Sequence, residues 1–178
     1  SQPRFINETM DVTQGKLAVG YRCTSDDYPA MVLANLIFGG TSNSKLFMNV
    51  REKLSLCYYA SSSYARSKNI ITVSSGVETG DRDRALEEID RQLKAVQRGD
   101  WEDWEQEGAL QAIRSSLLSL SDSQGALENF YLGQIASGVH ETPEELAAEL
   151  ERVTKERIVA AAQTVHLDTV YFLGGREA

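Results

Sequence analysis

The sequence predicts an α+β fold: a two-layer sandwich in which a mainly antiparallel sheet carries helices on one face. Two observations support this prediction. Segments that alternate polar and apolar residues, typical of strands with one buried face, occur early in the chain and at its end. Between them lie segments with apolar residues at three- and four-residue intervals, as expected for helices that pack on one side. Helices gathered between early and late strands favour the α+β class.

With 178 residues, the chain is predicted to form a single domain over 1–178, because a second independent core would be cramped. Its 18 Lys and Arg residues are outnumbered by 26 Asp and Glu residues, which gives a formal net charge of −8. This balance argues against a nucleic-acid partner, since nucleic-acid binding depends on clustered basic side chains. The sequence holds no apolar run of about 18 residues, so we expect no membrane-spanning helix.

The first ten residues, SQPRFINETM, have neither an initiating Met nor the charged-then-apolar pattern of a signal peptide. We interpret them as part of a linker, which would make the chain a fragment of a longer parent. Cys23 and Cys57 are the only cysteines, and both lie in apolar, strand-like settings. Two free, buried thiols favour a reducing compartment, so we expect a cytoplasmic protein.

The elements follow in order from the N-terminal side. Residues 16–24 alternate between apolar and polar side chains, which predicts the first strand. Asp26 and Asp27 can cap the next helix, whose residues 31–38 are apolar nearly all round, so this helix should be deeply buried. The glycine pair at 39–40 ends it. Because the Gly-Lys-Ser/Thr of a phosphate-binding loop is missing, we interpret this pair as a breaker between helices.

A second helix and a hairpin come next. Ser42 or Ser44 can cap this helix, whose apolar face continues to residue 54. Strands over 57–65 and 70–77, joined by a short turn, then form a β-hairpin. Its side chains are unusually small and polar, notably those of Ser61, Ser62, Ser63, Thr72, Ser74 and Ser75. We therefore expect one face of this sheet to be wet.

The remaining chain predicts five helices and a closing strand. Apolar stripes, capping residues and terminal glycines place the helices near 80–99, 100–117, 127–138, from Thr142 onward, and 154–165. Asp103 occupies the position of a weak capping box in the second of them. The run WEDWEQE there reads as a solvated helix start with tryptophan anchors. TVYFL at 169–173 forms the last strand.

Two catalytic patterns are set aside on sequence grounds. His140 and His166 are the only histidines, and no H-x-x-E-H or H-E-x-x-H is present, so the chain is not predicted to hold zinc itself. Ser42 and Lys45 form the S-x-x-K of penicillin-recognising acyl enzymes, but K-T-G and S-D-N are absent. We therefore expect Ser42 to be a helix cap and Lys45 to be a solvated side chain.

Arg51 and Tyr58 are the candidate functional pair. Taken alone, an Arg late in a helix usually interacts with the helix dipole, and a Tyr at the start of a strand usually belongs to the core. The setting favours a functional role, because both residues lie beside a glycine-rich connection and a small, polar sheet face. There a guanidinium and a phenol could each donate a hydrogen bond to an incoming carbonyl.

The segment SKLFMNVREKLSLCYYASSS (44–63) resembles the C-terminal-half motif of the pitrilysin/insulinase-type zinc metallopeptidases, the inverzincin family. QGKLAVGYR at 14–22 and LDTVYFL at 167–173 are similar as well, so the resemblance covers nearly the whole chain. It is most specific where Arg51, six intervening residues and Tyr58 match the family pattern.

This resemblance implies one half of a clamshell built from two homologous α+β halves. The other half carries H-x-x-E-H and a distal Glu, which supply zinc and the general base, so this chain is the C-terminal, non-zinc half and is inactive alone. Tyr58 would donate a hydrogen bond to the scissile carbonyl as its oxyanion develops, and Arg51 would hold a nearby substrate carbonyl or carboxylate. The implied partners are a peptide substrate and an H-x-x-E-H-bearing domain or subunit, in cis or in trans, as in bacterial two-chain peptidases.

The alternative is a non-proteolytic core or scaffold component, because the same fold also serves that role in respiratory assemblies. A pure scaffold has no chemical need for the Arg51 and Tyr58 pair, which favours the peptidase interpretation. A zinc motif in the missing upstream sequence or in a neighbouring gene would support the peptidase, and its absence from both would support the scaffold.

Overall fold

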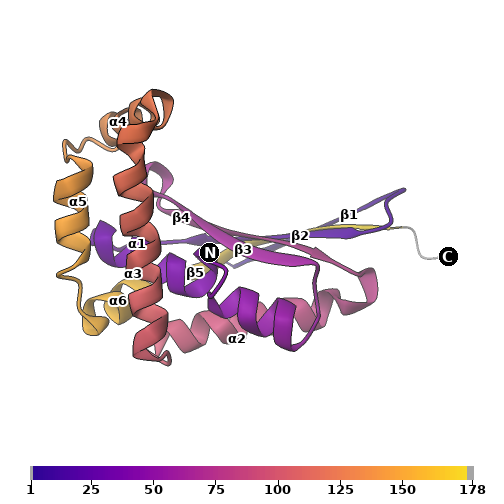
Figure 1. Cartoon of the computed structure of the whole chain (residues 1–178). Helices are drawn as coiled ribbons and strands as arrows, with labels where there is room; N and C mark the ends of the chain where they lie inside the picture. Colours follow the sequence, from indigo (N-terminus) through magenta and orange to yellow (C-terminus); the bar gives the residue numbers. More distant parts are fainter. Residues whose placement is uncertain (1, 176–178) are drawn as a thin grey trace.

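The computed structural model of the chain describes residues 2–175 (Figure 1). Its five strands are β1 (Arg4–Met10), β2 (Gly15–Arg22), β3 (Tyr59–Ala65), β4 (Ile70–Val77) and β5 (His166–Gly175). They form one sheet in the order β1-β5-β2-β4-β3. All neighbouring pairs are antiparallel except β1 and β5, which run parallel. The predicted α+β class with a mainly antiparallel sheet is confirmed.

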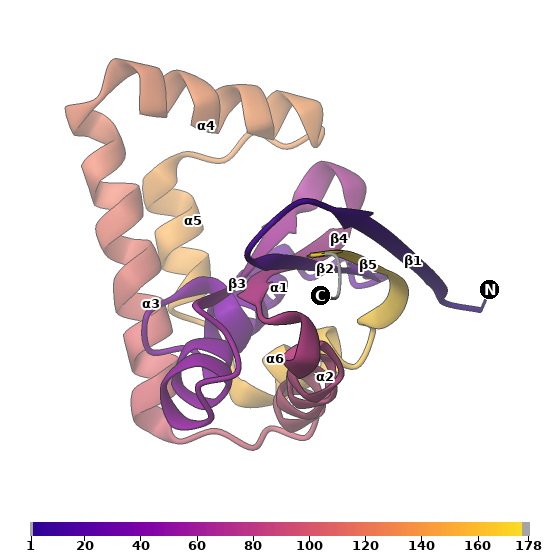
Figure 2. The same ribbon diagram turned by 90° about the vertical axis from the view of Figure 1, so that its right-hand side faces the viewer.

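Helices cover one face of the sheet and extend beyond one of its ends (Figures 1 and 2). Two of them, η1 and η2, have π-helical hydrogen bonding. The helical elements are α1 (Tyr28–Asn35), η1 (Leu36–Gly40), η2 (Leu46–Lys53), α2 (Arg82–Gln97), α3 (Asp103–Leu118), α4 (Gln124–Ala136), α5 (Pro143–Leu150) and α6 (Lys155–Ala162). Short 3-10 turns follow β3 (η3, Arg66–Lys68), β4 (η4, Thr79–Asp81) and α3 (η5, Ser119–Asp122).

The core lies between the sheet and the helices that cross it. Alternate residues of β2, including Leu17 and Val19, are buried on the face of the sheet that the helices cover, as the period of two predicts. The segment formed by α1 and η1 is buried on most of its circumference, with Met31, Ile37 and Phe38 no more than 2 % exposed. The prediction of a deeply buried helix that ends at the glycine pair is confirmed.

β1 corrects the interpretation of residues 1–10 as a linker. Arg4 to Met10 pair in register with Thr169 to Gly175 of β5 and form the sheet edge. All seven residues of β1 are exposed, so the strand buries no alternate side chains and leaves no period of two in the sequence. Backbone pairing, supported by contacts such as the hydrogen bond from Tyr171 Oη to Glu8 Oε2 at 2.9 Å, holds it in place.

The start of α3 also differs from the prediction. The helix begins at Asp103 rather than near 100, and Glu102 is its N-cap residue. The Glu105 carboxylate accepts the Glu102 N–H at 2.8 Å, so the capping box uses this pair and not Asp103. Trp101 is buried, but Trp104 is 54 % exposed, so only one of the two tryptophans anchors this helix. The predicted caps of the other helices, Asp27, Thr142 and Thr154, are confirmed.

The hairpin of β3 and β4 leaves one face of the sheet uncovered. Ser61, Ser63 and Ser74 on this side are exposed, which confirms the predicted wet face. Ser62 and Ser75 point the other way and are buried; Ser62 Oγ donates to Asn35 Oδ1 at 2.8 Å, so these two serines are part of the covered face. We call the uncovered side, with Ala18, Gly20, Ser61, Ser63, Thr72 and Ser74 at its centre, the open face.

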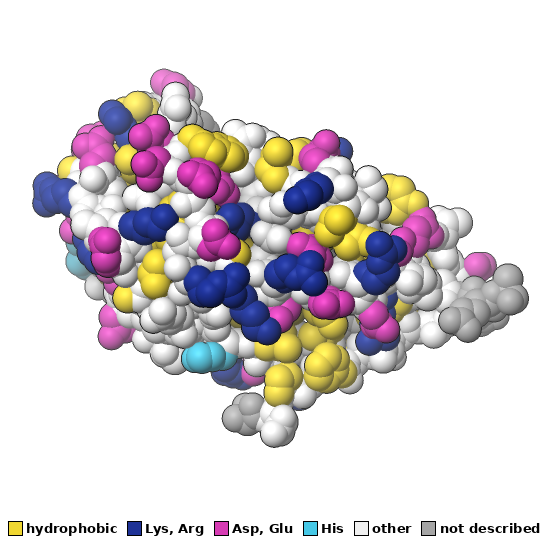
Figure 3. Space-filling view, turned by 90° about the horizontal axis from the view of Figure 1, so that it is seen from below, with side chains coloured by type: hydrophobic (Ala, Val, Ile, Leu, Met, Phe, Trp, Pro, Cys, Tyr) yellow, Lys and Arg dark blue, Asp and Glu magenta, His cyan; other side chains and the backbone are white. Residues whose placement is uncertain are grey.

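Charge is spread over the helical layer. Seen from below, acidic and basic side chains are interspersed rather than gathered by sign (Figure 3). Among residues 2–175, no helix combines the length and apolar composition that crossing a membrane requires.

Cys23 and Cys57 are both free and buried, as predicted. Burial raises the pKa of the Cys23 thiol to about 11, which keeps it protonated and unreactive at neutral pH.

Candidate functional site

Arg51 lies in the last turns of η2, with its side chain about two-fifths exposed. Its guanidinium carbon lies 4.7 Å from the ring centroid of Phe47, four residues earlier on the same helix face. The nearest carboxylate is that of Glu52, with Nε and Oε1 3.6 Å apart, which is too long for a hydrogen bond. The stacked guanidinium therefore keeps free N–H donors on its solvent side.

Tyr58 lies between η2 and β3 and is 55 % exposed, so the alternative that it belongs to the core is wrong. Its backbone is fixed, because its N–H donates to the Gly76 carbonyl at 2.8 Å. Its hydroxyl donates a hydrogen bond to the carboxylate of Glu78, just beyond the end of β4. This bond raises the pKa of Tyr58, since the carboxylate stabilises the protonated phenol.

Close packing of the η1–η2 connection on β3 places Arg51 near this position. A Cβ added at Gly39 would lie 2.6 Å from Leu46 Cδ1 and 2.8 Å from the Ser62 backbone nitrogen, so only glycine allows this approach. Burial raises the pKa of the Cys57 thiol, and the positive charge of Arg51 opposes that rise. The Ser55 N–H donates to the Arg51 carbonyl at 3.1 Å and the Leu56 N–H to the Val50 carbonyl at 3.0 Å, so the end of η2 lies beside the segment that leads to Tyr58.

Arg51, near the end of η2, and Tyr58, just before β3, lie in the same part of the molecule but do not bind each other. In the described part of the chain, no hydrogen bond or ion pair links Arg51 to Tyr58, and each has its own partner. Neither of these partners, Phe47 and Glu78, was predicted from the sequence. Phe47 was detectable as the residue four positions before Arg51. Glu78 was detectable because hairpin pairing with a turn at 66–69 places residues 77–78 opposite Tyr58.

The open face begins beside Tyr58. The ring of the next residue, Tyr59, lies on Gly76, whose added Cβ would be 2.6 Å from a Tyr59 ring carbon. Lys16 Nζ lies 5.5 Å from the centroid of the same ring. Beyond them the side chains are small, so an extended chain could approach the sheet closely here.

Lys45 is not the solvated side chain that the sequence analysis predicted. It is buried, and its Nζ lies 3.2 Å from Glu105 Oε1, in an ion pair that links η2 to α3. Ser44 rather than Ser42 acts at the start of the helix, with Ser44 Oγ accepting the Phe47 N–H at 3.4 Å. The S-x-x-K lysine therefore has a structural partner and does not contact Ser42.

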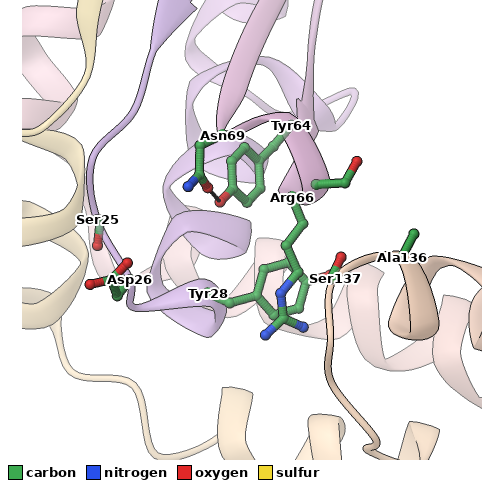
Figure 4. A pocket seen from close by; sticks show the side chains of 9 residues that line it. Ser25, Asp26, Tyr28, Tyr64, Arg66, Asn69, Ala136 and Ser137 are labelled. Atoms are coloured by element: carbon green, nitrogen blue, oxygen red, sulfur yellow. Dashed lines mark hydrogen bonds between the residues drawn. The ribbon is translucent and has the colours of Figure 1, made fainter.

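A separate hollow of about 300 Å³ lies at the far end of β3 (Figure 4). The guanidinium carbon of Arg66 lies 3.8 Å from the ring centroid of Tyr28, and its Nη1 is 3.9 Å from Glu141 Oε2. The Tyr64 hydroxyl donates to Asn69 Oδ1 at 2.9 Å. Because these groups engage one another, we interpret the hollow as a junction between the β3–β4 turn, α1 and the end of α4.

No group of three or more His, Cys, Asp or Glu side chains that could hold a metal ion occurs within residues 2–175. The Arg51 guanidinium offers hydrogen-bond donors at this site, and the Tyr58 hydroxyl offers one more when it is not bound to Glu78.

The model of the family described as "Peptidase M16 inactive domain" matches residues 1–113. The chain belongs to the M16 peptidase family. The M16 chain is 41 % identical to a Bacillus subtilis protein described as a probable inactive metalloprotease, YmfF, over 99 % of its own length and 42 % of that protein. It is 24 % identical to a second B. subtilis protein, described as an uncharacterized zinc protease, YmxG, over 91 % of this chain and 42 % of that protein.

Among solved structures, a conserved protein from Enterococcus faecalis superposes on this M16 chain with a TM-score of 0.91 and 32 % identity. The match covers 99 % of this chain and 43 % of the other. The chain thus spans about two-fifths of the length of the relatives it matches. The family membership implied by the segment around Arg51 and Tyr58 is confirmed.

Proposed function

We propose that this M16 inactive domain is the substrate-binding, transition-state-assisting half of a zinc-dependent endopeptidase. One observation carries the proposal: the side chains of Arg51 and Tyr58 are both partly exposed to solvent, near an open face of small side chains. A domain whose only role was structural would have no reason to leave Tyr58 55 % exposed. We place the chain, as a single domain over 1–178, in the C-terminal, non-zinc position.

Each donor has a distinct role in this proposal. Tyr58 donates its hydroxyl hydrogen to the scissile carbonyl oxygen, which gains negative charge as water adds to the carbonyl carbon. Arg51 holds a neighbouring backbone carbonyl or carboxylate of the substrate and thereby fixes the register of the peptide. The stack on Phe47 restricts the guanidinium, so less side-chain entropy is lost when substrate binds.

The chain is inactive alone, because its sequence has no H-x-x-E-H and its two histidines are His140 and His166. A homologous half that carries H-x-x-E-H, in cis or in trans, supplies the zinc, and zinc when bound there polarises the carbonyl and activates water. Two findings support such a partner: the relatives are more than twice as long as this chain, and one of them is described as a zinc protease.

The substrates are peptides or unfolded segments that can lie extended along the open face. Its central residues, such as Gly20 and Ser74, offer little bulk to obstruct a bound backbone. The net charge of −8 favours substrates that are not strongly acidic. We place the protein in the bacterial cytoplasm, which the two free, buried cysteines support.

A second candidate is a non-proteolytic scaffold with the same fold. The observation that favours it is the description of the 41 % identical relative as a probable inactive metalloprotease. The retained donors at Arg51 and Tyr58 favour the peptidase.

Cleavage assays on the full-length protein that contains this chain, together with its H-x-x-E-H half, separate the two candidates. With a fluorogenic peptide library, we expect cleavage that a zinc chelator abolishes and that Arg51→Lys lowers, because an ammonium cannot reproduce the planar, stacked fork of arginine. Lys53→Ala, which removes a neighbouring charge on the same helix, serves as the control and should retain activity. No cleavage of any library member would favour the scaffold.

A further inference from the structure

The hydroxyl of Tyr58 is already engaged in this structure. A phenol has a single O–H, and that of Tyr58 donates to the Glu78 carboxylate. While this bond persists, the same hydrogen cannot be donated to a substrate carbonyl. Whatever role Tyr58 has toward a substrate therefore depends on how readily it leaves Glu78.

The protein backbone fixes both partners of this contact. The Tyr58 N–H donates to the Gly76 carbonyl at 2.8 Å, at the end of the β3–β4 pair. Glu78 directly follows β4, and its carbonyl accepts the Asp81 N–H at 3.0 Å, which closes the first turn before α2. The two side chains thus face each other from two anchored positions, although both are exposed to solvent.

The charge of Glu78 has no cation to offset it nearby. Within residues 2–175, no Lys or Arg lies within ion-pairing distance of its carboxylate, and Arg82, the nearest cation along the chain, pairs with Asp83 instead. A carboxylate beside a hydrogen-bond donor opposes the growth of negative charge on any oxygen that the donor contacts, since like charges repel.

We propose that Glu78 is a positioning residue that holds Tyr58 in a resting arrangement and opposes transfer of its hydrogen bond to the substrate. This inference rests on the proposed function, because it concerns how that site becomes available. Substrate must displace Glu78 before the phenol can stabilise the oxyanion. Glu78 thereby reduces the activity of the site, and its effect acts on the transition state rather than on ground-state binding.

Two substitutions distinguish the effect of the Glu78 charge from the effect of its contact with Tyr58. Glu78→Gln keeps the length and an acceptor oxygen but removes the charge, whereas Glu78→Ala removes both. In the full-length enzyme, Glu78→Ala should raise kcat by about three- to tenfold with little change in KM, the range expected for loss of one competing hydrogen bond. Glu78→Gln, which keeps a weaker neutral acceptor, should raise kcat by a smaller factor. Glu128→Gln is the matched control, since Glu128 lies on α4, away from the open face, and accepts a hydrogen bond from Gln124, and it should leave the rate unchanged.

The decisive comparison repeats these substitutions in a Tyr58→Phe background. If Glu78 acts through the Tyr58 hydroxyl, neither Glu78 substitution changes the rate when that hydroxyl is absent. A separate readout uses the Tyr58 phenol itself, by NMR of 13C-labelled tyrosine assigned with Tyr58→Phe. Its pKa should fall toward the ordinary tyrosine value in both Glu78 variants, because the neighbouring carboxylate is gone.

An unchanged Tyr58 pKa in the Glu78 variants would overturn the inference, because the contact would not exist. An unchanged or reduced rate in Glu78→Gln, or the same change with and without the Tyr58 hydroxyl, would overturn it too. If the wild-type enzyme cleaves peptides and Tyr58→Phe costs nothing, the proposed function of Tyr58 itself fails, whatever the Glu78 variants do. If no variant cleaves any peptide, both proposals fail.

Discussion

At the residue scale, the two donors of the site depend on neighbours that restrict them in different ways. Arg51 is held by an apolar ring, which leaves its N–H groups available, while Tyr58 is held by a carboxylate, which occupies its hydroxyl. A guanidinium has several donors, whereas a phenol has one, so an internal partner affects Tyr58 far more than Arg51. We therefore expect Tyr58 to be the more sensitive of the two positions.

Gly39 is the residue whose size controls how η1 and η2 approach β3. Gly39→Ala should destabilise the fold by about 1–3 kcal/mol, because the added methyl group meets both Leu46 and the Ser62 backbone, which cannot move away easily. Gly108→Ala is the control, since that helical position faces open space, and it should stabilise the protein by about 0.5–1 kcal/mol. Urea unfolding measures both; a neutral Gly39→Ala would show that the approach is loose.

At the element scale, η2 is fixed against α3 by a pair of buried charges. Lys45 and Glu105 each have side chains only 10–12 % exposed, and their charged atoms are 3.2 Å apart. The same network continues through Asn49, which donates to Gln92 Oε1 at 3.0 Å, and so reaches α2. Because Arg51 lies on η2, these contacts set the position from which it reaches solvent.

Removal of one charge from this pair should cost more than removal of both. Lys45→Met leaves the Glu105 carboxylate buried without its cation, which we expect to lower the free energy of unfolding by about 3–5 kcal/mol. Adding Glu105→Gln should recover much of that loss, because the amide oxygen can still accept the Glu102 N–H of the capping box. Urea titration of the two single variants and the double variant measures the coupling, and additive losses would contradict it.

Asp27 links α1 to α6 and makes the stability depend on pH. Its carboxylate caps α1 and accepts two hydrogen bonds from Arg157, both 2.9 Å long, and this pairing lowers the pKa of Asp27. A carboxyl whose pKa is lower in the folded state stabilises the fold above its unfolded pKa, about 4, and loses that contribution as pH falls through the folded value.

Asp27→Asn should therefore reduce the loss of stability between about pH 5 and pH 2, because an amide retains the capping oxygen but does not titrate. The exposed pair itself contributes about 1 kcal/mol or less at neutral pH. Thermal unfolding of both proteins across this pH range measures the difference. Parallel pH profiles for the wild type and Asp27→Asn would contradict the assignment.

Most elements could be predicted because they bury a face, and the errors occur where that signal is missing. The helices of the core and the hairpin follow from periodicity and caps, but β1 buries no side chain and depends on backbone pairing with a strand 165 positions later, Arg4 with Thr169. The burial of Lys45 could not be predicted either, since it depends on how α3 crosses η2. Tyr58 and Arg51 were found through family resemblance, while the contact with Glu78 required the strand register.

At the scale of the whole molecule, helices cover one face of the sheet and the other remains open (Figure 2). Tyr58 directly precedes β3, whose residues Ser61 and Ser63 lie on the open face, and the proposed function places an extended peptide along this face. The proposed function requires a second half that brings zinc to the same peptide. In the proposed function, the Tyr58 hydroxyl stabilises the transition state formed there.

The most direct measurement compares Tyr58→Phe with Tyr59→Phe in the full-length enzyme, each assayed for kcat and KM on one cleaved peptide. Tyr59 is the matched control, an exposed tyrosine one position along the chain whose ring lies on Gly76. We predict that Tyr58→Phe lowers kcat on the order of 10²–10³-fold with KM nearly unchanged, the loss expected for one oxyanion donor. Tyr59→Phe should stay close to wild type. Equal activities for the two variants, with both folded, would contradict the account.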